Sequence, residues 1–240
     1  MERTTLVDAD GVVGRYDPYE RDGHRYADLF DRDPGVSVER AREAVLAQFG
    51  GMRIAADEPL GRSLMERGGR LLRHAHLMSH DLGERRDWES PPGYRLTEVD
   101  RPAADLLDAY RAAFPLGHVD FRDEPPETTL GDLESHLSGR DFGPLLRGSG
   151  LAVASDGTVA GAILLGVLPG EPPLNGPWVI ELFRHPAHRG IGRPLLDRAL
   201  ALVPVPVLGL IVSEGNPARW LYEDAGFRVV STRLVVQLQG

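Results

Sequence analysis

Cysteine is absent from the 240 residues, and this excludes disulfide bonds, thiolate catalysis and cysteine-ligated metal centres. Lysine is absent too, since all 27 basic residues are arginine, so no side-chain ammonium is available for Schiff-base chemistry. Long apolar runs are also missing. The most apolar stretch, residues 200–212, is interrupted by Pro204 and Pro206 and is too short to span a bilayer. With no apolar signal-peptide core after Met1, the sequence predicts a cytoplasmic protein without membrane association.

The balance of charge is acidic, with a formal net charge of −9. Such a charge disfavours nucleic acid and anionic lipid as partners, and it would attract a cationic acceptor such as an amine. The length allows one large domain or two small ones, with ample surface to bury.

A short turn between a strand pattern and a helix pattern is the most informative stretch. The apolar run 178–183 predicts a strand, and Leu195 begins an apolar stripe at helical spacing. Gly190 and Gly192 let the backbone approach a ligand closely, and the first amides of a helix favour an anion. Arg189 and Arg193 flank the turn. The pattern predicts a phosphate cradle, and the alternative is a plain turn with solvated arginines.

This turn carries a family resemblance. Arg-Gly-Ile-Gly at a helix start resembles motif A of the GNAT superfamily, the acetyl-CoA-dependent N-acyltransferases, with the family glycines at Gly190 and Gly192. Ala187 stands where the family has Gln or Arg, and the loop is shorter than usual. Residues 216–227, Asn-Pro-Ala-Arg-Trp-Leu-Tyr-Glu-Asp-Ala-Gly-Phe, follow another apolar strand and resemble motif B. The two motifs occur in the family's order.

The resemblance implies a GNAT fold of the α/β class. Its mixed, mostly antiparallel sheet is split into a V where strands 178–184 and 207–213 part, with helices on both faces. It also implies acetyl-CoA as co-substrate and no metal. The residues expected to contact the co-substrate are Leu182, Phe183, Arg184, His188, Arg189, Gly190, Ile191, Gly192, Arg193 and Asn216.

Two residues are candidates for catalysis. Glu181 is the one charged residue of the apolar run 178–183, and a carboxylate there must face a cleft or carry a desolvation cost. The family places a base on this strand, whereas a structural role is the alternative, and Glu214 is a weaker candidate base. The resemblance implies that Tyr222 protonates the departing thiolate, and the alternative is a packed aromatic. Asn216 in turn is either a helix cap or a contact of the pantetheine arm.

The function implied is transfer of an acetyl group from acetyl-CoA to a primary amine of a small molecule or peptide. Without cysteine no thiol-linked acyl-enzyme can form, so direct transfer in a ternary complex is the simpler mechanism. The competing hypothesis is a non-catalytic GNAT scaffold that binds acyl-CoA or a partner. A homodimer is left open.

The domain organisation suggests two GNAT-like parts. A charged linker at 84–93 divides a truncated, degenerate GNAT-like domain (1–83) from a GNAT domain (94–240). Residues 51–72 align without gaps on 209–230, including Pro59 on Pro217 and Gly68 on Gly226. Where the second part has Arg-Gly-Ile-Gly, the first has aspartates at 31 and 33, which would repel a phosphate. A chance likeness between two βαβ pieces is the alternative.

The second part is expected to contain the complete GNAT order of elements. Between its first two helices lies an acidic loop that suits an amine acceptor or is simply solvated; it contains Gly117-His118 with Asp120, Asp123, Glu124 and Glu127. His74, His76 and His80 form a spaced cluster for which a solvated face is favoured over a metal site. The expected elements are strands 94–99, 151–154, 159–168, 178–184, 207–213 and 228–238, and helices 103–114, 130–137, 194–203 and 217–225.

Overall fold

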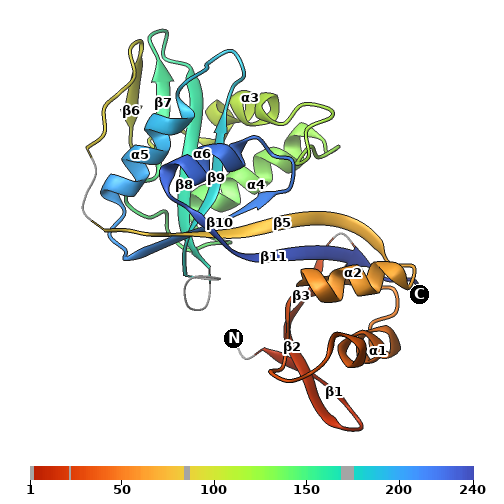
Figure 1. The fold of residues 1–240 in the computed structure, drawn as a ribbon. Helices are drawn as coiled ribbons and strands as arrows, with labels where there is room; N and C mark the ends of the chain where they lie inside the picture. Colours follow the sequence, from red (N-terminus) through yellow and green to blue (C-terminus); the bar gives the residue numbers. More distant parts are fainter. Residues whose placement is uncertain (1–2, 22, 84–86, 169–175) are drawn as a thin grey trace. The chain divides into compact units, whose positions relative to one another are not determined.

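The chain forms two compact units in the computed structural model, which describes residues 3–21, 23–83, 87–168 and 176–240. Unit 1 comprises Met1–Leu77 with Ser231–Gly240, and unit 2 comprises Met78–Val230 (Figure 1). The boundaries therefore fall inside two long strands, β5 (Arg70–Asp81) and β11 (Arg228–Gln237), and not at the predicted linker. Of that linker, residues 84–86 lie outside the described residues.

Unit 1 is a sheet in the order β1-β2-β3-β4-β11-β5, to which two helices belong. Strands β1 to β3 are antiparallel neighbours, while β3 and β4 are parallel and joined through α1. Phe30, Ile54 and Leu234 are buried in its core. The remaining elements are β1 (Thr4–Asp8), β2 (Gly11–Arg21), β3 (His24–Arg32), α1 (Val38–Gln48), β4 (Arg53–Asp57) and α2 (Glu58–Glu66).

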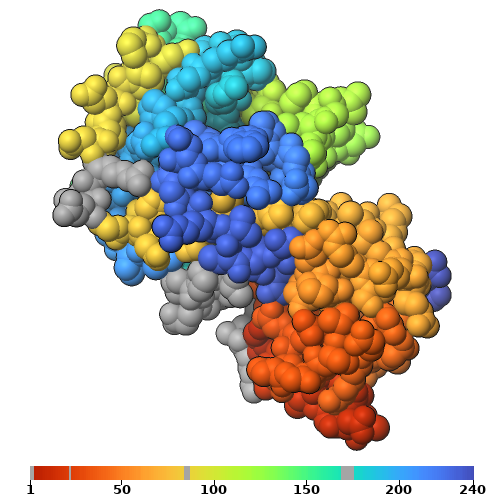
Figure 2. Space-filling model, viewed as in Figure 1, coloured from red at the N-terminus to blue at the C-terminus, as the bar shows by residue number. Residues whose placement is uncertain are grey.

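Unit 2 is a sheet in the order β5-β10-β9-β8-β7-β6. One core cluster joins α5 and α6 to one face, and a second joins α3 and α4 to the other, as strand alternation requires (Figure 1). The segments of α5 and α6, in two shades of blue, lie at the surface in Figure 2. The elements are β6 (Tyr94–Thr97), α3 (Ala103–Ala113), α4 (Pro126–Ser138), β7 (Gly150–Ala154), β8 (Val159–Leu168), β9 (Gly176–Arg184), α5 (Gly192–Leu202), β10 (Val207–Ser213) and α6 (Ala218–Ala225). This mixed, mostly antiparallel α/β sheet with helices on both faces confirms the predicted fold class.

The two aligned segments share one order of elements. In each, a strand, a helix and a parallel strand succeed one another: β3, α1 and β4 in unit 1, and β9, α5 and β10 in unit 2. The next strand of each segment pairs within the other segment's sheet. β5 follows β4 in the chain but lies beside β10, and β11 follows β10 in the chain but pairs with β4. These are the two strands that the sequence alignment matches with each other. The origin of the first part as a degenerate GNAT domain stays a prediction.

Two helices differ from their predicted bounds by two residues or more. α4 begins at Pro126, four residues earlier than expected, because proline fits the first helical turn; it ends where Gly139 adopts φ +75°. α5 begins at Gly192 and not at Pro194. Among the described helices, none has the length and apolar character that crossing a bilayer requires.

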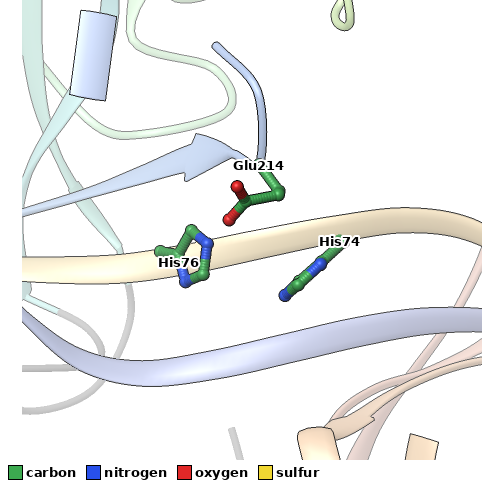
Figure 3. A group of neighbouring side chains, drawn as sticks. All are labelled: His74, His76 and Glu214. Atoms are coloured by element: carbon green, nitrogen blue, oxygen red, sulfur yellow. The ribbon is translucent and has the colours of Figure 1, made fainter. Parts of the chain in front are cut away.

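The histidines of β5 do not form the solvated face that was predicted. His76 and His80 are both buried. In unit 1 the His76 ring lies 3.0 Å from the Thr232 hydroxyl and 5.0 Å, centroid to centroid, from the His74 ring (Figure 3). In unit 2 the His80 ring meets the Ala225 carbonyl at 3.0 Å. The prediction was wrong because it treated this strand as an outer one, whereas β5 has strand neighbours in both units.

Strands β8 and β9 approach each other so closely at Gly161 that a larger residue there should destabilise the protein. A Cβ at Gly161 would lie 2.5 Å from the Phe183 carbonyl oxygen and 3.0 Å from the Arg184 Cα, so the backbone of β9 would have to shift. We expect Gly161→Ala to lower the free energy of unfolding by about 1–3 kcal/mol in urea titrations. Gly131→Ala is the matched control. Its Cβ meets nothing within 4 Å on α4, so it should stabilise by up to about 1 kcal/mol. Equal effects of both changes would contradict the packing argument.

Candidate active site

The start of α5 presents backbone donors that the protein does not use. Ile191 occupies the N-cap position and provides no side-chain cap. Within the described part of the chain, the N–H groups of residues 189–193 donate to no side chain and no carbonyl. Gly190 adopts φ +85°, which a residue with a Cβ rarely does. Free amides at the positive end of a helix are suited to an anion.

The corresponding helix of unit 1 lacks this property. The Ser37 side chain accepts a hydrogen bond from the Arg40 amide at 3.2 Å and so caps α1. The preceding aspartates pair with arginines: Asp31 with Arg3 and Arg233, and Asp33 with Arg15. A capped helix start beside carboxylates does not attract a phosphate.

The two arginines of the α5 turn differ in whether their guanidinium groups already form ion pairs. Arg189 is exposed and has no ion pair among the described residues. Arg193 is engaged internally, because its guanidinium binds Asp197 at 2.8 Å and also binds Asp224. The expected contact of the Arg193 side chain with a phosphate would therefore require these ion pairs to break. The sequence did not indicate this pairing, since Asp224 lies on another helix.

His188 also has partners within unit 2. Its amide donates to the His185 carbonyl at 2.9 Å, and its ring Nδ1 lies 3.0 Å from the Tyr94 hydroxyl. The N–H of His188 is thus used by the turn itself, so the available amides begin at Arg189 and not at His188 as expected.

Strands β9 and β10 part as the predicted V requires. The register between them is limited to the pair Gly209 and Trp178, near the start of β9. On its other side β9 pairs with β8 along its length, including Leu182 with Ile163 and Arg184 with Gly161. Among the described residues, the backbone of residues 182–184 therefore pairs with no residue of β10, which leaves it available at the opening. A register shift at Leu164/Leu165 puts a bulge in the β8–β9 pairing next to Glu181.

Glu181 lies on the face of β9 that meets α3. It accepts a hydrogen bond from the Tyr110 hydroxyl at 3.3 Å. Burial raises the pKa of Glu181 to about 7, although the charge of Arg122 and the Tyr110 hydroxyl favour the ionised form. A carboxylate with this pKa is suited to accept a proton near neutral pH. Glu214, the weaker candidate, is exposed and paired with Arg219 at 3.1 Å.

Tyr222 is buried in the core cluster beneath α6, with 7 % of its surface exposed. Its ring packs edge-on against Phe227 at 5.9 Å, so it is a packed aromatic. Burial raises the pKa of the Tyr222 hydroxyl, and the negative charges of Glu181 and Asp120 raise it further. The hydroxyl therefore keeps its proton at neutral pH and lies within electrostatic reach of both carboxylates.

Asn216 fulfils the structural role that its sequence context indicates. Its side-chain oxygen accepts from the Ala218 amide at 2.8 Å and supports the start of α6. Its side-chain amide donates to Asp120 at 2.7 Å, and the Ser213 hydroxyl donates to the same carboxylate at 2.5 Å. Asp120 thereby ties the loop between α3 and α4 to the end of β10.

Comparisons with known proteins address the fold. Neither a family model nor a curated protein matches the sequence. Among solved structures, a GCN5-related N-acetyltransferase from Sphaerobacter thermophilus superposes with TM-score 0.65 at 17% identity, covering 97% of this chain and 78% of that one. A tandem GNAT protein from the clavulanic acid biosynthesis pathway gives TM-score 0.55 at 17% identity, with coverages of 95% and 79%. A GCN5-related N-acetyltransferase from Kribbella flavida gives 0.53 at 18%, with coverages of 99% and 90%.

The chain has the GNAT fold. The candidate site includes two residues that the sequence analysis did not identify. Tyr110 binds Glu181, and Asp120 joins the loop between α3 and α4 to the end of β10. The sequence placed Tyr110 only within the predicted helix 103–114, and Asp120 only within an acidic loop. Nothing in the local sequence signals either partner, because Tyr110 and Asp120 lie 71 and 93 residues from the side chains they contact.

The GNAT turn supports a prediction about binding. Gly190→Val would force a β-branched residue into φ +85° and turn the amides away. We therefore expect the affinity for acetyl-CoA, the co-substrate that the sequence resemblance implies, to fall tenfold or more, roughly the value of one charge-assisted hydrogen bond. Arg193→Gln is the control and should have a smaller effect, because its guanidinium is already engaged with Asp197 and Asp224. Isothermal titration calorimetry measures both. A larger loss for Arg193→Gln would contradict the priority given to the backbone.

Proposed function

We propose that this protein is an N-acetyltransferase that moves an acetyl group from acetyl-CoA to a primary amine. The observation that carries the proposal is the set of unused amides at the start of α5, beside the opening between β9 and β10. In the proposal the amides of residues 189–193 hold the pyrophosphate, with Arg189 adding positive charge. The backbone of residues 182–184 faces the pantetheine arm and thioester.

The chemistry assigned to the side chains follows from their protonation. Glu181 accepts a proton from the amine, whose nitrogen forms a bond to the thioester carbonyl carbon. The carbon–sulfur bond then breaks, and Tyr222 donates its proton to the departing thiolate. A carboxylate with a pKa of about 7 and a hydroxyl that stays protonated are suited to these roles. No covalent acyl-enzyme is required.

Asn216 receives a different assignment from the one the resemblance implied. Since both ends of its side-chain amide are used within unit 2, it acts by holding α6 and Asp120 in place. It need not contact the pantetheine arm.

Two measurements, made one after the other, test the proposal. Isothermal titration with acetyl-CoA establishes binding, and a thiol-release assay over a panel of primary amines establishes transfer. Binding together with amine-dependent thiol release is expected. Binding without release by any amine would contradict the enzyme and favour a non-catalytic acyl-CoA-binding scaffold, whereas absence of binding would contradict both.

A further inference from the structure

Two neighbouring histidines of β5 in unit 1 take part in no step of the proposed function. His74 and His76 are two residues apart on one strand, so their side chains lie on the same face of it. Their ring centroids are 5.0 Å apart, and one nitrogen of each ring lies within 4.8 Å of a nitrogen of the other (Figure 3). Two imidazoles this close can share one ligand.

The His74 ring contains a buried nitrogen that the protein does not satisfy. The Nε2 atom of His74 is buried and meets no hydrogen-bond partner among the residues that the structure describes. Buried polar atoms in proteins almost always have a partner, and a bound ion is one of the few explanations for an exception. The side chain as a whole is only half-buried, so an ion at this nitrogen can still carry water molecules.

The His76 ring is held in an orientation that suits a metal ligand. It is buried, and its Nδ1 lies 3.0 Å from the Thr232 hydroxyl on β11, within the same unit. A histidine that binds a metal through one nitrogen usually donates the hydrogen of the other nitrogen to an oxygen, which fixes the ring. With Nε2 on a metal, Nδ1–H of His76 would donate to Thr232. The metal would replace the partner that Nε2 has in the metal-free protein.

Imidazole nitrogen also selects the kind of metal. Zinc and neighbouring transition metals bind imidazole well, whereas magnesium and calcium require oxygen ligands. Zinc–nitrogen bonds of about 2.0–2.1 Å in tetrahedral geometry place two ligand nitrogens about 3.4 Å apart. Small rotations of the two rings reach this separation from one that is already within 4.8 Å.

We propose that His74 and His76 bind a zinc ion in unit 1 through their Nε2 atoms, with Thr232 orienting the His76 ring and water completing the coordination. Catalytic and structural zinc centres have three or four protein ligands, so this ion is held more weakly and exchanges with solution. Because it binds the folded state, it stabilises the protein by mass action. The site does not depend on the acetyltransferase chemistry, and its failure would leave the proposed function intact.

Isothermal titration of the untagged protein with zinc chloride tests the site. We expect saturable binding of zinc and none of magnesium. Thr232→Val keeps the β-branched shape but removes the hydroxyl, and loss of such an outer partner lowers metal affinity by about 10–100-fold. His74→Ala, which leaves one protein ligand, should weaken zinc binding at least about tenfold. A thermal melt of each variant without metal verifies that it is folded.

A second pair of histidines provides the matched control. The His185 and His188 rings of unit 2 are 5.7 Å apart, and the His188 Nδ1 already meets the Tyr94 hydroxyl. We expect His188→Ala to bind zinc with unchanged affinity. Absence of saturable zinc binding would overturn the inference, as would a loss confined to His188→Ala or an affinity that both His74→Ala and Thr232→Val leave unchanged.

Imidazole nitrogen NMR identifies the ligand atoms directly. In long-range ¹H–¹⁵N spectra we expect zinc to shift the Nε2 resonances of His74 and His76, while those of His185 and His188 stay in place. Shifts at other histidines alone would overturn the assignment even if zinc binds.

Discussion

Glu181→Gln is expected to lower turnover roughly a hundredfold or more while acetyl-CoA binds with unchanged affinity, because a general base contributes about 10²–10⁴-fold. Glutamine has the shape of the carboxyl group and can still accept the hydrogen bond from Tyr110, so the surroundings of β9 should persist. What the variant loses is a proton acceptor. A thiol-release assay measures the turnover number, and isothermal titration calorimetry measures the affinity for acetyl-CoA.

The pH dependence separates this role from a structural one. Since the pKa of Glu181 is raised to about 7, the carboxyl group is protonated and inactive as a base below that pH and ionised above it. The ratio of wild-type to Glu181→Gln turnover should therefore rise with pH through about 7 and then level off. Ionisation of the amine acceptor affects both proteins alike and cancels in the ratio. A ratio independent of pH would contradict the assignment.

Glu214→Gln is the matched control for this experiment. Glu214 is exposed and its carboxylate pairs with Arg219, so its loss should leave turnover near the wild-type value. Should Glu214→Gln carry the large loss instead, the base would have to be reassigned to the end of β10.

Tyr222→Phe is expected to lower turnover on the order of a hundredfold, with binding of acetyl-CoA unchanged, because the variant keeps the packed ring and removes the proton donor. The ring contact with Phe227 should preserve the fold, which a urea titration verifies. Without the hydroxyl, the thiolate must leave unprotonated or take its proton from water. Thiol release under saturating acetyl-CoA and amine measures the loss directly.

A second tyrosine provides the comparison for the same chemical change. Tyr19→Phe removes a hydroxyl from β2 in unit 1, and turnover should be unaffected. Unchanged turnover in Tyr222→Phe would remove Tyr222 from the scheme and leave it as a core aromatic.

The sequence was sufficient to predict the parts of the site that depend on local order. The turn after β9 follows from glycines whose backbone preferences are short-range, and Pro194 indicated the helix start to within two residues of its observed position at Gly192. The mixed sheet could be predicted because its strands alternate with helical stripes in the GNAT order.

What the sequence did not indicate are contacts between residues distant in the chain. Arg193 appeared available for a phosphate until the structure showed its pairing with Asp224, 31 residues later. The role of Asp120 depends on two donors more than 90 residues away. The exchange of β5 and β11 is likewise invisible in hydrophobic patterning, because the two strands begin with the similar sequences Arg-Leu-Leu-Arg and Arg-Val-Val-Ser.

The proposed function depends on bare main-chain donors at the start of α5 that hold the pyrophosphate of acetyl-CoA. Titration of ¹⁵N-labelled protein with acetyl-CoA, followed by the amide resonances of Arg189, Gly190, Ile191 and Gly192, tests it most directly. We expect these amides to shift downfield as they form hydrogen bonds to phosphate, whereas the Ser37–Arg40 amides of α1 should not shift. Saturable binding that leaves the four resonances unmoved, or no binding at millimolar acetyl-CoA, would contradict it.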